Sequence, residues 1–168
     1  MRFVTMIVVI VSILICSPAV FAETARAVLK DANGKQVGNV TLTELPHGVL
    51  IKTDLFNILP GIHAFHIHSV GECKPPFKSA GGHFNPEGKA HGLLNGKGPH
   101  AGDLPNIYVG TDGKLTFEVI ADKVTLKKGM NSLHDKDGSA IVIHAGADDY
   151  VSDPAGNAGP RIACGIIR

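Results

Sequence analysis

Six of the nine histidines in this chain of 168 residues occur at spacings that could hold metal ions. His66 and His68 lie two residues apart in the segment GIHAFHIH. Residues two apart on a strand point to the same face, so both imidazoles can reach one ion. His63 has the opposite parity and is expected to make structural hydrogen bonds. Two further histidines, His47 in a turn and His134, are expected to be ordinary surface or core side chains without a metal.

A second group of candidate ligands follows in a segment rich in glycine and proline. Its members are His83, His91, His100 and Asp103. Three imidazoles and one carboxylate suit a tetrahedral zinc ion, and a segment of this composition can fold around one ion. A loop this polar would depend on the metal for its order, so the zinc would be structural as well as electronic.

A third segment, the apolar run 140–144, ends at His144. From a neighbouring strand, His144 could meet His66 and His68. When His83 is added, four imidazoles in a tetragonal arrangement favour copper. His83 would then serve both the copper set and the zinc set.

Short segments with the alternation typical of β-strands must position these residues. Turn residues such as Asn33-Gly34 and Asp112-Gly113 separate one segment from the next. The expected strands span residues 26–30, 36–45, 49–55, 62–69, 107–109, 115–121, 140–144 and 162–167. No window shows helical periodicity. The pattern predicts an all-β fold, an eight-stranded antiparallel β-sandwich or barrel.

Two connections, residues 70–106 and 145–160, are much longer than the hairpins. Long loops inside a compact domain are usually functional or disordered. The six spaced histidines lie within or at the edges of these loops, which disorder does not require. We therefore expect both loops to be functional.

Residues 1–22 have the layout of a secretory signal peptide, with an apolar stretch followed by small residues and cleavage expected after Ala22. The stretch is too short to span a bilayer. Lipidation at Cys16 is an alternative, although Ile15 stands where such sites favour a small side chain. Residues 23–168 would then form one domain.

Removal of Arg2 with the leader leaves equal numbers of basic and acidic residues, so the mature chain has no formal net charge. This balance does not favour a nucleic-acid partner or attachment to a membrane surface. Only Cys73 and Cys164 remain after cleavage, and a pair in an oxidising compartment is usually a disulfide. Two free buried thiols are the alternative.

Over residues 24–168 the sequence resembles the copper/zinc superoxide dismutases, particularly the bacterial periplasmic branch. The segments that carry the resemblance are GIHAFHIH, GGHFNPEGKAHG, GPHAGDLPNI, AIVIHAGADD and GPRIACGII. The resemblance implies a Greek-key, immunoglobulin-like sandwich. It implies copper ligands His66, His68, His83 and His144, and zinc ligands His83, His91, His100 and Asp103, with His83 bridging both metals.

The same resemblance implies roles for residues outside the ligand sets. Asp148 would link a copper histidine to a zinc histidine. Cys73 would pair with Cys164 and pin the metal loop to the last strand, and Arg161 would receive a small anion beside the copper. The second long loop lacks the charged cluster of the eukaryotic branch. The lysines of the first loop could supply that attraction instead: Lys74, Lys78, Lys89 and Lys97.

The activity that the resemblance implies is dismutation of superoxide to dioxygen and hydrogen peroxide, with His83 supplying a proton. A copper- and zinc-binding protein without turnover is the alternative, but it would not need Arg161. A scaffold sandwich would tolerate loss of ligands, and none is lost. The resemblance places the mature protein in the periplasm, and the sequence leaves both a monomer and a homodimer open.

Overall fold

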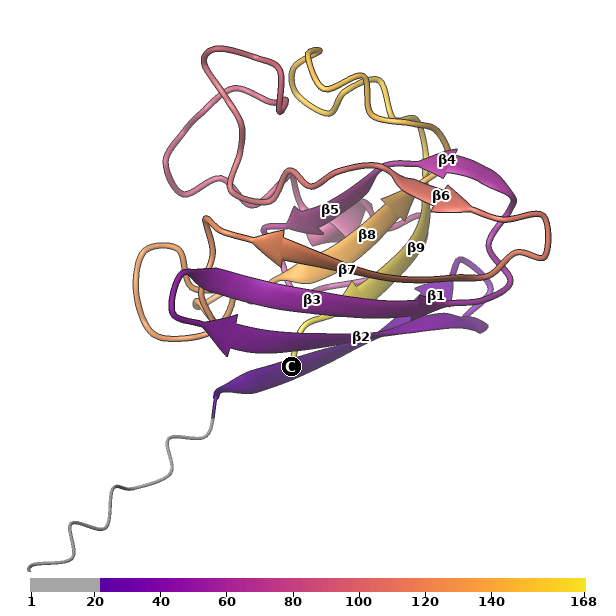
Figure 1. Cartoon of the computed structure of the whole chain (residues 1–168), viewed down its shortest axis with the longest axis horizontal. Coiled ribbons are helices and arrows are strands. Elements are labelled where there is room, and N and C mark those ends of the chain that lie inside the picture. The colour runs from indigo at the N-terminus through magenta and orange to yellow at the C-terminus, as the bar shows by residue number, and fades with distance from the viewer. Residues whose placement is uncertain (1–21) are drawn as a thin grey trace, which may run out of the picture.

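The structure is a computed structural model that describes residues 22–168 (Figure 1). The expected leader, residues 1–22, lies outside the described residues except for Ala22. The described part contains one short 3-10 helix, Lys78–Ala80, and nine strands. The strands are β1 (Thr24–Asp31), β2 (Gln36–Leu45), β3 (Gly48–Leu55), β4 (Gly61–His63), β5 (Phe65–His68), β6 (Ile107–Val109), β7 (Leu115–Ala121), β8 (Ala140–His144) and β9 (Arg161–Ile166).

Seven strands form one antiparallel sheet in the order β5-β8-β9-β1-β2-β3-β7, and β4 pairs with β6 in a small second sheet. A late strand, β9, returns to lie beside β1, which is the connection typical of a Greek key. The predicted all-β antiparallel class is therefore confirmed.

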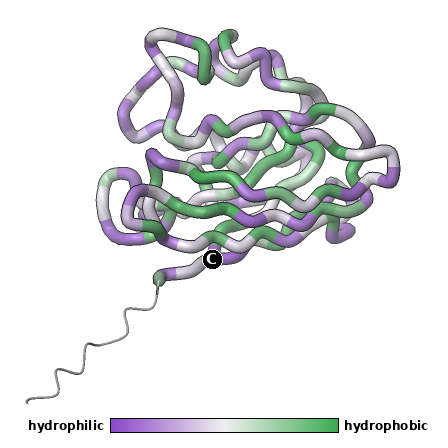
Figure 2. The backbone as a smooth tube through the Cα atoms, in the orientation of Figure 1, coloured by the Kyte–Doolittle hydropathy of each residue, from purple (hydrophilic) through white to green (hydrophobic). Residues whose placement is uncertain are grey.

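The core lies inside the curl of the larger sheet. Along β1, Ala25, Ala27 and Leu29 are buried while the residues between them are exposed, and Figure 2 shows similar alternation on the neighbouring strands. The ring of Phe65 on β5 meets the ring of Phe117 on β7 edge-on, with centroids 5.2 Å apart. Because β5 and β7 are the two edges of the sheet, this contact means that the sheet curls until its edges face each other across the core.

The eight expected strands are all present, but the run predicted at residues 62–69 is divided at Ala64. Before the break β4 pairs with β6, and after it β5 pairs with β8. Ala64 itself donates to the Gly146 carbonyl and accepts from the His144 amide. The strand changes partners at this residue, and hydrophobic periodicity carries no information about that change.

A third long connection, residues 122–139, was not distinguished by the sequence. It covers one end of the core with Leu126 and Leu133, which are buried. The carboxylate of Glu44 on β2 holds it in place by accepting hydrogen bonds from the Leu126 amide and the Thr125 hydroxyl, both at 2.7 Å.

The two loops expected to be functional lie beside each other along one edge of the molecule (Figure 1). A hydrogen bond of 3.0 Å from the Leu94 amide to the Tyr150 carbonyl joins them directly. Among residues 22–168, no helix has the length and hydrophobicity needed to cross a membrane.

Candidate metal centre

The histidines singled out by their spacing converge beneath the two long loops. Ligand atoms within 4.8 Å of one another define two groups, one of His66, His68, His83 and His144 and one of His83, His91, His100 and Asp103. All seven residues are buried. His83 belongs to both groups, as the sequence predicted.

Strand pairing explains how the first group assembles. His66 and His68 are on β5 and face β8, where Val142 pairs with His66. Cross-strand partners share a face, and residues two apart on a strand share it as well. His144, two residues beyond Val142, therefore points to the same side as His66 and His68.

Two β-bridges, each a single residue pair, bring residues of the first long loop next to β5. His83 pairs with His68, and Asp103 pairs with His66. The first long loop is thus attached to β5 at two points, one on each side of the segment that carries His91 and His100. This attachment lets residues far apart in the sequence serve one centre.

His63 is buried but belongs to neither group, in agreement with the prediction from its parity. Its Nδ1 lies 2.9 Å from the His144 carbonyl oxygen and its Nε2 lies 2.7 Å from the Leu59 carbonyl oxygen. The ring therefore holds the backbone of His144 in place. His47 and His134 are exposed and belong to neither group.

Hydrogen bonds decide which ring nitrogen of each histidine faces the centre. His68 Nδ1 lies 3.0 Å from the Gly81 carbonyl, and His144 Nδ1 lies 3.2 Å from the Gly159 carbonyl. A carbonyl oxygen only accepts, so each Nδ1 carries the hydrogen and each Nε2 keeps its lone pair. His66 is reversed, because its Nε2 donates to the Asp148 carboxylate at 2.8 Å and its Nδ1 is left with the lone pair.

Buried ring nitrogens without partners mark the first group. His66 Nδ1 and His83 Nε2 make no hydrogen bond with any of the described residues. Buried polar atoms are almost always satisfied, so exceptions need an explanation. Four imidazole lone pairs directed at one point suit copper, and the first group fits that ion.

The second group is arranged around one carboxylate oxygen. The Nδ1 atoms of His83, His91 and His100 lie 2.7, 3.1 and 3.2 Å from Asp103 Oδ1. The other oxygen, Oδ2, accepts from the backbone amides of Gly92 and His100 at 2.9 and 3.0 Å, which fixes the direction of Oδ1. Three Nδ1 atoms and one carboxylate oxygen suit tetrahedral zinc.

Burial sets the protonation states that metal binding requires. It lowers the pKa of His68 to about 2 and the pKa of His144 to about 3, with nearby cationic groups adding to the effect. Burial also lowers the pKa of His83, to about 4, although the hydrogen bond to Asp103 opposes it. For Asp103, burial acts to raise the pKa, but hydrogen bonds from His100 and His83 outweigh it and the pKa is lowered. At neutral pH the imidazoles of His68, His83 and His144 are therefore neutral and the Asp103 carboxylate is ionised, as metal binding requires.

Asp148 connects the two groups through one histidine of each, His66 and His91. Its carboxylate accepts from His66 Nε2 at 2.8 Å and from His91 Nε2 at 2.9 Å. Burial acts to raise the pKa of Asp148, but these hydrogen bonds outweigh it and bring the pKa to about 2. Gly156 has a φ of +60° and packs on this carboxylate so closely that a Cβ there would collide with it.

Asp153 was missed by the sequence reasoning. Its Oδ1 accepts from the backbone amide of His91 at 2.6 Å, so the second long loop holds a zinc-group residue by its main chain. Only the clustering of acidic residues in that loop could have drawn attention to it, and clustering alone does not distinguish it from solvated neighbours.

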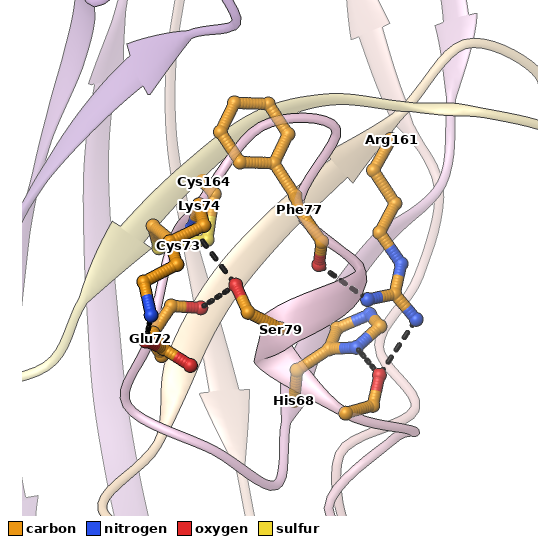
Figure 3. Close-up of a disulfide and its surroundings, with 9 residues drawn as sticks. His68, Glu72, Cys73, Lys74, Phe77, Ser79, Arg161 and Cys164 are labelled. Carbon is orange, nitrogen blue, oxygen red and sulfur yellow. Dashed lines mark hydrogen bonds and ion pairs between the residues drawn. A yellow bond between two sulfur atoms is a disulfide. The ribbon is translucent and has the colours of Figure 1, made fainter.

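Arg161 and the disulfide attach the last strand to the first long loop (Figure 3). Cys73 and Cys164 form the predicted disulfide, with Cα atoms 5.7 Å apart and a sequence separation of 91. The guanidinium of Arg161 donates to the Phe77 and Gly81 carbonyls, both at 2.6 Å. The Gly81 carbonyl also accepts from His68 (Figure 3), so Arg161 is held next to a member of the copper group.

Comparison with known proteins identifies the family. The family model described as copper/zinc superoxide dismutase (SODC) matches residues 36–167. The chain belongs to the copper/zinc superoxide dismutase family. Its activity is the dismutation of superoxide, and its cofactors are copper and zinc.

The relatives of this superoxide dismutase include bacterial enzymes along most of its length. A copper/zinc superoxide dismutase of Aquifex aeolicus is 58% identical over 147 residues, which cover 86% of each chain. That of Caulobacter vibrioides is 48% identical over 149 residues, again 86% of each chain.

Solved structures of the family agree with the fold. The copper/zinc superoxide dismutase from Brucella abortus superimposes with a TM-score of 0.72 at 32% identity, covering 87% of this chain and 100% of that one. A variant of a superoxide dismutase-like protein from Bacillus subtilis superimposes with a TM-score of 0.82 at 46% identity, covering 84% of this chain and 95% of that one.

Proposed function

We propose that the two groups of residues divide the metals between them. Copper binds His66 Nδ1 and the Nε2 atoms of His68, His83 and His144. Zinc binds Asp103 Oδ1 and the Nδ1 atoms of His83, His91 and His100. The observation that carries this assignment is the set of buried ring nitrogens whose lone pairs face these two points. His83 would serve both groups, because Nε2 belongs to the first and Nδ1 to the second.

Each protein group then has one task in the reaction. Copper would supply the one-electron chemistry, in which one superoxide gives up an electron and leaves as dioxygen while a second takes up that electron and two protons and leaves as hydrogen peroxide. His83 Nε2 would hold one of these protons when it is not bound to copper, and the other would come from water. The zinc group fixes the ring of His83 from its other side, so this nitrogen stays aimed at the copper group.

We assign to Arg161 the capture of the substrate anion. Superoxide is a small monoanion, and a planar guanidinium offers it several donors in a fixed fork. Arg161 pairs with His144 across β8 and β9, which places the charge beside the copper group. Its two hydrogen bonds to backbone carbonyls hold the fork in one orientation.

A combined metal and activity measurement tests the assignment. The purified mature protein should contain one copper and one zinc per chain and should accelerate the decay of superoxide. A protein that holds both metals without accelerating the decay would be a metal-buffering or delivery protein.

Export to the periplasm is the compartment that we propose. The disulfide supports an oxidising environment, and bacterial members of the family are close relatives. Cleavage after Ala22 is tested by the N-terminal sequence of the protein recovered from a periplasmic fraction. The lack of nucleic-acid and membrane partners after cleavage remains a prediction from the sequence, as does assembly as a monomer or homodimer, which sedimentation would test.

A further inference from the structure

Two residues outside the ligand groups, Asn106 and Tyr150, connect the long loops beside Asp148. Asn106 ends the first loop, immediately before β6, and Tyr150 lies in the second loop. The backbone amide of Asn106 donates to the Tyr150 hydroxyl oxygen at 2.7 Å. The side chain of Asn106 binds the backbone of Asp148 in the second loop. Its Nδ2 donates to the Asp148 carbonyl at 2.9 Å, and its Oδ1 accepts from the Asp148 amide at 2.8 Å.

The backbone of Tyr150 adds further contacts to the same structure. Its amide donates to Asp148 Oδ1 at 2.6 Å, and its carbonyl accepts from the Leu94 amide at 3.0 Å. The first loop passes so close that a Cβ at Gly92 would collide with this carbonyl. Tyr150 has a φ of 64°, which is unusual for a residue with a side chain. Such a conformation persists only where the surroundings over-determine it.

The position of Asp148 matters because its carboxylate decides which nitrogens of His66 and His91 face the metals. Both rings donate from Nε2 to this carboxylate, which leaves each Nδ1 free to bind. Asn106 bonds both the amide and the carbonyl of Asp148 and so fixes the backbone on both sides of its Cα atom. The Tyr150 amide fixes one carboxylate oxygen of Asp148. The carboxylate therefore has little freedom to turn away.

We propose that Tyr150 and Asn106 form a clamp that holds Asp148 in place before any metal binds. The clamp makes both metal groups preorganised in the metal-free protein and slows the loss of zinc from the finished enzyme. Tyr150 is a positioning residue in this scheme, since its contacts are with Asp148 and the loops. The inference rests on the zinc assignment made under the proposed function.

The replacement Tyr150→Phe tests the clamp by removing one oxygen atom. The ring and the backbone contacts of residue 150 remain, but the Asn106 amide loses its acceptor. The loss of this hydrogen bond should weaken zinc binding by about 3- to 10-fold, which corresponds to the contribution of one ordinary hydrogen bond. The matched control is Tyr108→Phe, because Tyr108 is the other tyrosine of the chain and is exposed.

The measurement is chelator competition on metal-free protein reloaded with zinc alone. We expect zinc to dissociate about 3- to 10-fold faster from Tyr150→Phe than from wild type, and at the wild-type rate from Tyr108→Phe. Cobalt in place of zinc should show a changed visible spectrum in Tyr150→Phe, which a general loss of stability would not produce. Equal zinc dissociation in the two variants overturns the proposal.

A second measurement needs no variant. In the metal-free wild-type protein the amide hydrogens of Asn106 and Asp148 should exchange slowly, because the clamp already protects both. Free exchange at these two amides overturns the proposal. Zinc retention and amide exchange report on the clamp even if the metal-loaded wild-type protein fails to consume superoxide, so failure of the clamp and failure of the proposed function are separable.

Discussion

Nε2 of His68 lies 3.4 Å from Nε2 of His144, and neither nitrogen carries a hydrogen to place between them. Each ring has its hydrogen on Nδ1, where it is donated to a backbone carbonyl. Two lone pairs that face each other are stable only with a cation or a proton between them. Burial lowers the pKa of both rings, which disfavours a proton in that place at neutral pH, and the two facing lone pairs suit a metal ion.

The first prediction concerns the acid sensitivity of the metal-free protein. Because the folded pKa values of His68 and His144 are about 2 and about 3, the unfolded chain binds more protons below its ordinary histidine pKa of 6.5. The free energy of unfolding should therefore be full above pH 6.5 and fall as the pH drops toward 3, by up to about 1.4 kcal/mol per pH unit for each ring.

Thermal unfolding of the metal-free protein between pH 7 and pH 4 provides the measurement. His68→Gln removes one of the titrating rings and should make the dependence on pH shallower, whereas His47→Gln, at an exposed turn, should not. A melting temperature that stays constant from pH 7 to pH 4 would contradict the expectation.

The second prediction separates the two metals. Replacing His91 with alanine or Asp103 with asparagine should release zinc, because each supplies one of four ligand atoms. Copper should persist in weakened form, since the lone pairs of His66, His68 and His144 remain. Elemental analysis checks both metals, with His134→Ala as an exposed control. Unchanged zinc in the His91 and Asp103 variants would rule out the assignment.

The strands and the shared face of His66 and His68 could be predicted because they follow a two-residue periodicity, whereas the grouping of His83, His91, His100 and Asp103 came from the composition of their loop and from the family resemblance. The two-residue spacing of His66 and His68 placed them on one face, and the opposite parity of His63 placed it elsewhere. The break at Ala64 could not be predicted, because the chain changes its partner strand there while the residues keep a β pattern.

The choice of ring nitrogen was also beyond the sequence. It depends on acceptors such as the Gly81 and Gly159 carbonyls, which come near only when the loops fold. Asn106 and Tyr150 were missed for the same reason, because each acts through backbone atoms of residues more than 40 positions away. Backbone partners leave no trace in the spacing of residue types.

The third prediction concerns the disulfide. Replacing both Cys73 and Cys164 with serine should lower the free energy of unfolding by about 2 to 5 kcal/mol, because the unfolded chain regains freedom. The bridge also anchors the loop whose Phe77 carbonyl holds Arg161, so superoxide capture should weaken in protein with full metal content. Denaturant unfolding and activity per bound copper measure the two effects, and mass spectrometry of non-reduced wild type should find no free thiol.

The last prediction is that Arg161 accelerates capture of superoxide without being required to hold copper. Residues 23–168 contain equal numbers of basic and acidic residues, so the field that attracts an anion must be local to the site. Lys74 contributes little, since it is paired with Glu72, whereas Lys78 follows Phe77, whose carbonyl accepts from Arg161. Arg161→Glu should reduce the rate of superoxide capture more than Arg161→Lys, because the new carboxylate repels the substrate anion.

Arg161→Lys is the matched control, because it keeps the charge and loses the fork that reaches both the Phe77 and the Gly81 carbonyls. Its rate should lie between those of wild type and Arg161→Glu. The field of solvent-exposed charges is screened over about 8 Å at physiological ionic strength, so the wild-type rate should fall as the salt concentration rises. In Arg161→Glu this dependence of the rate on salt should flatten or reverse. If Arg161→Glu retains copper by elemental analysis and also turns over like wild type across the salt series, then Arg161 does not guide the anion and the local field has another source.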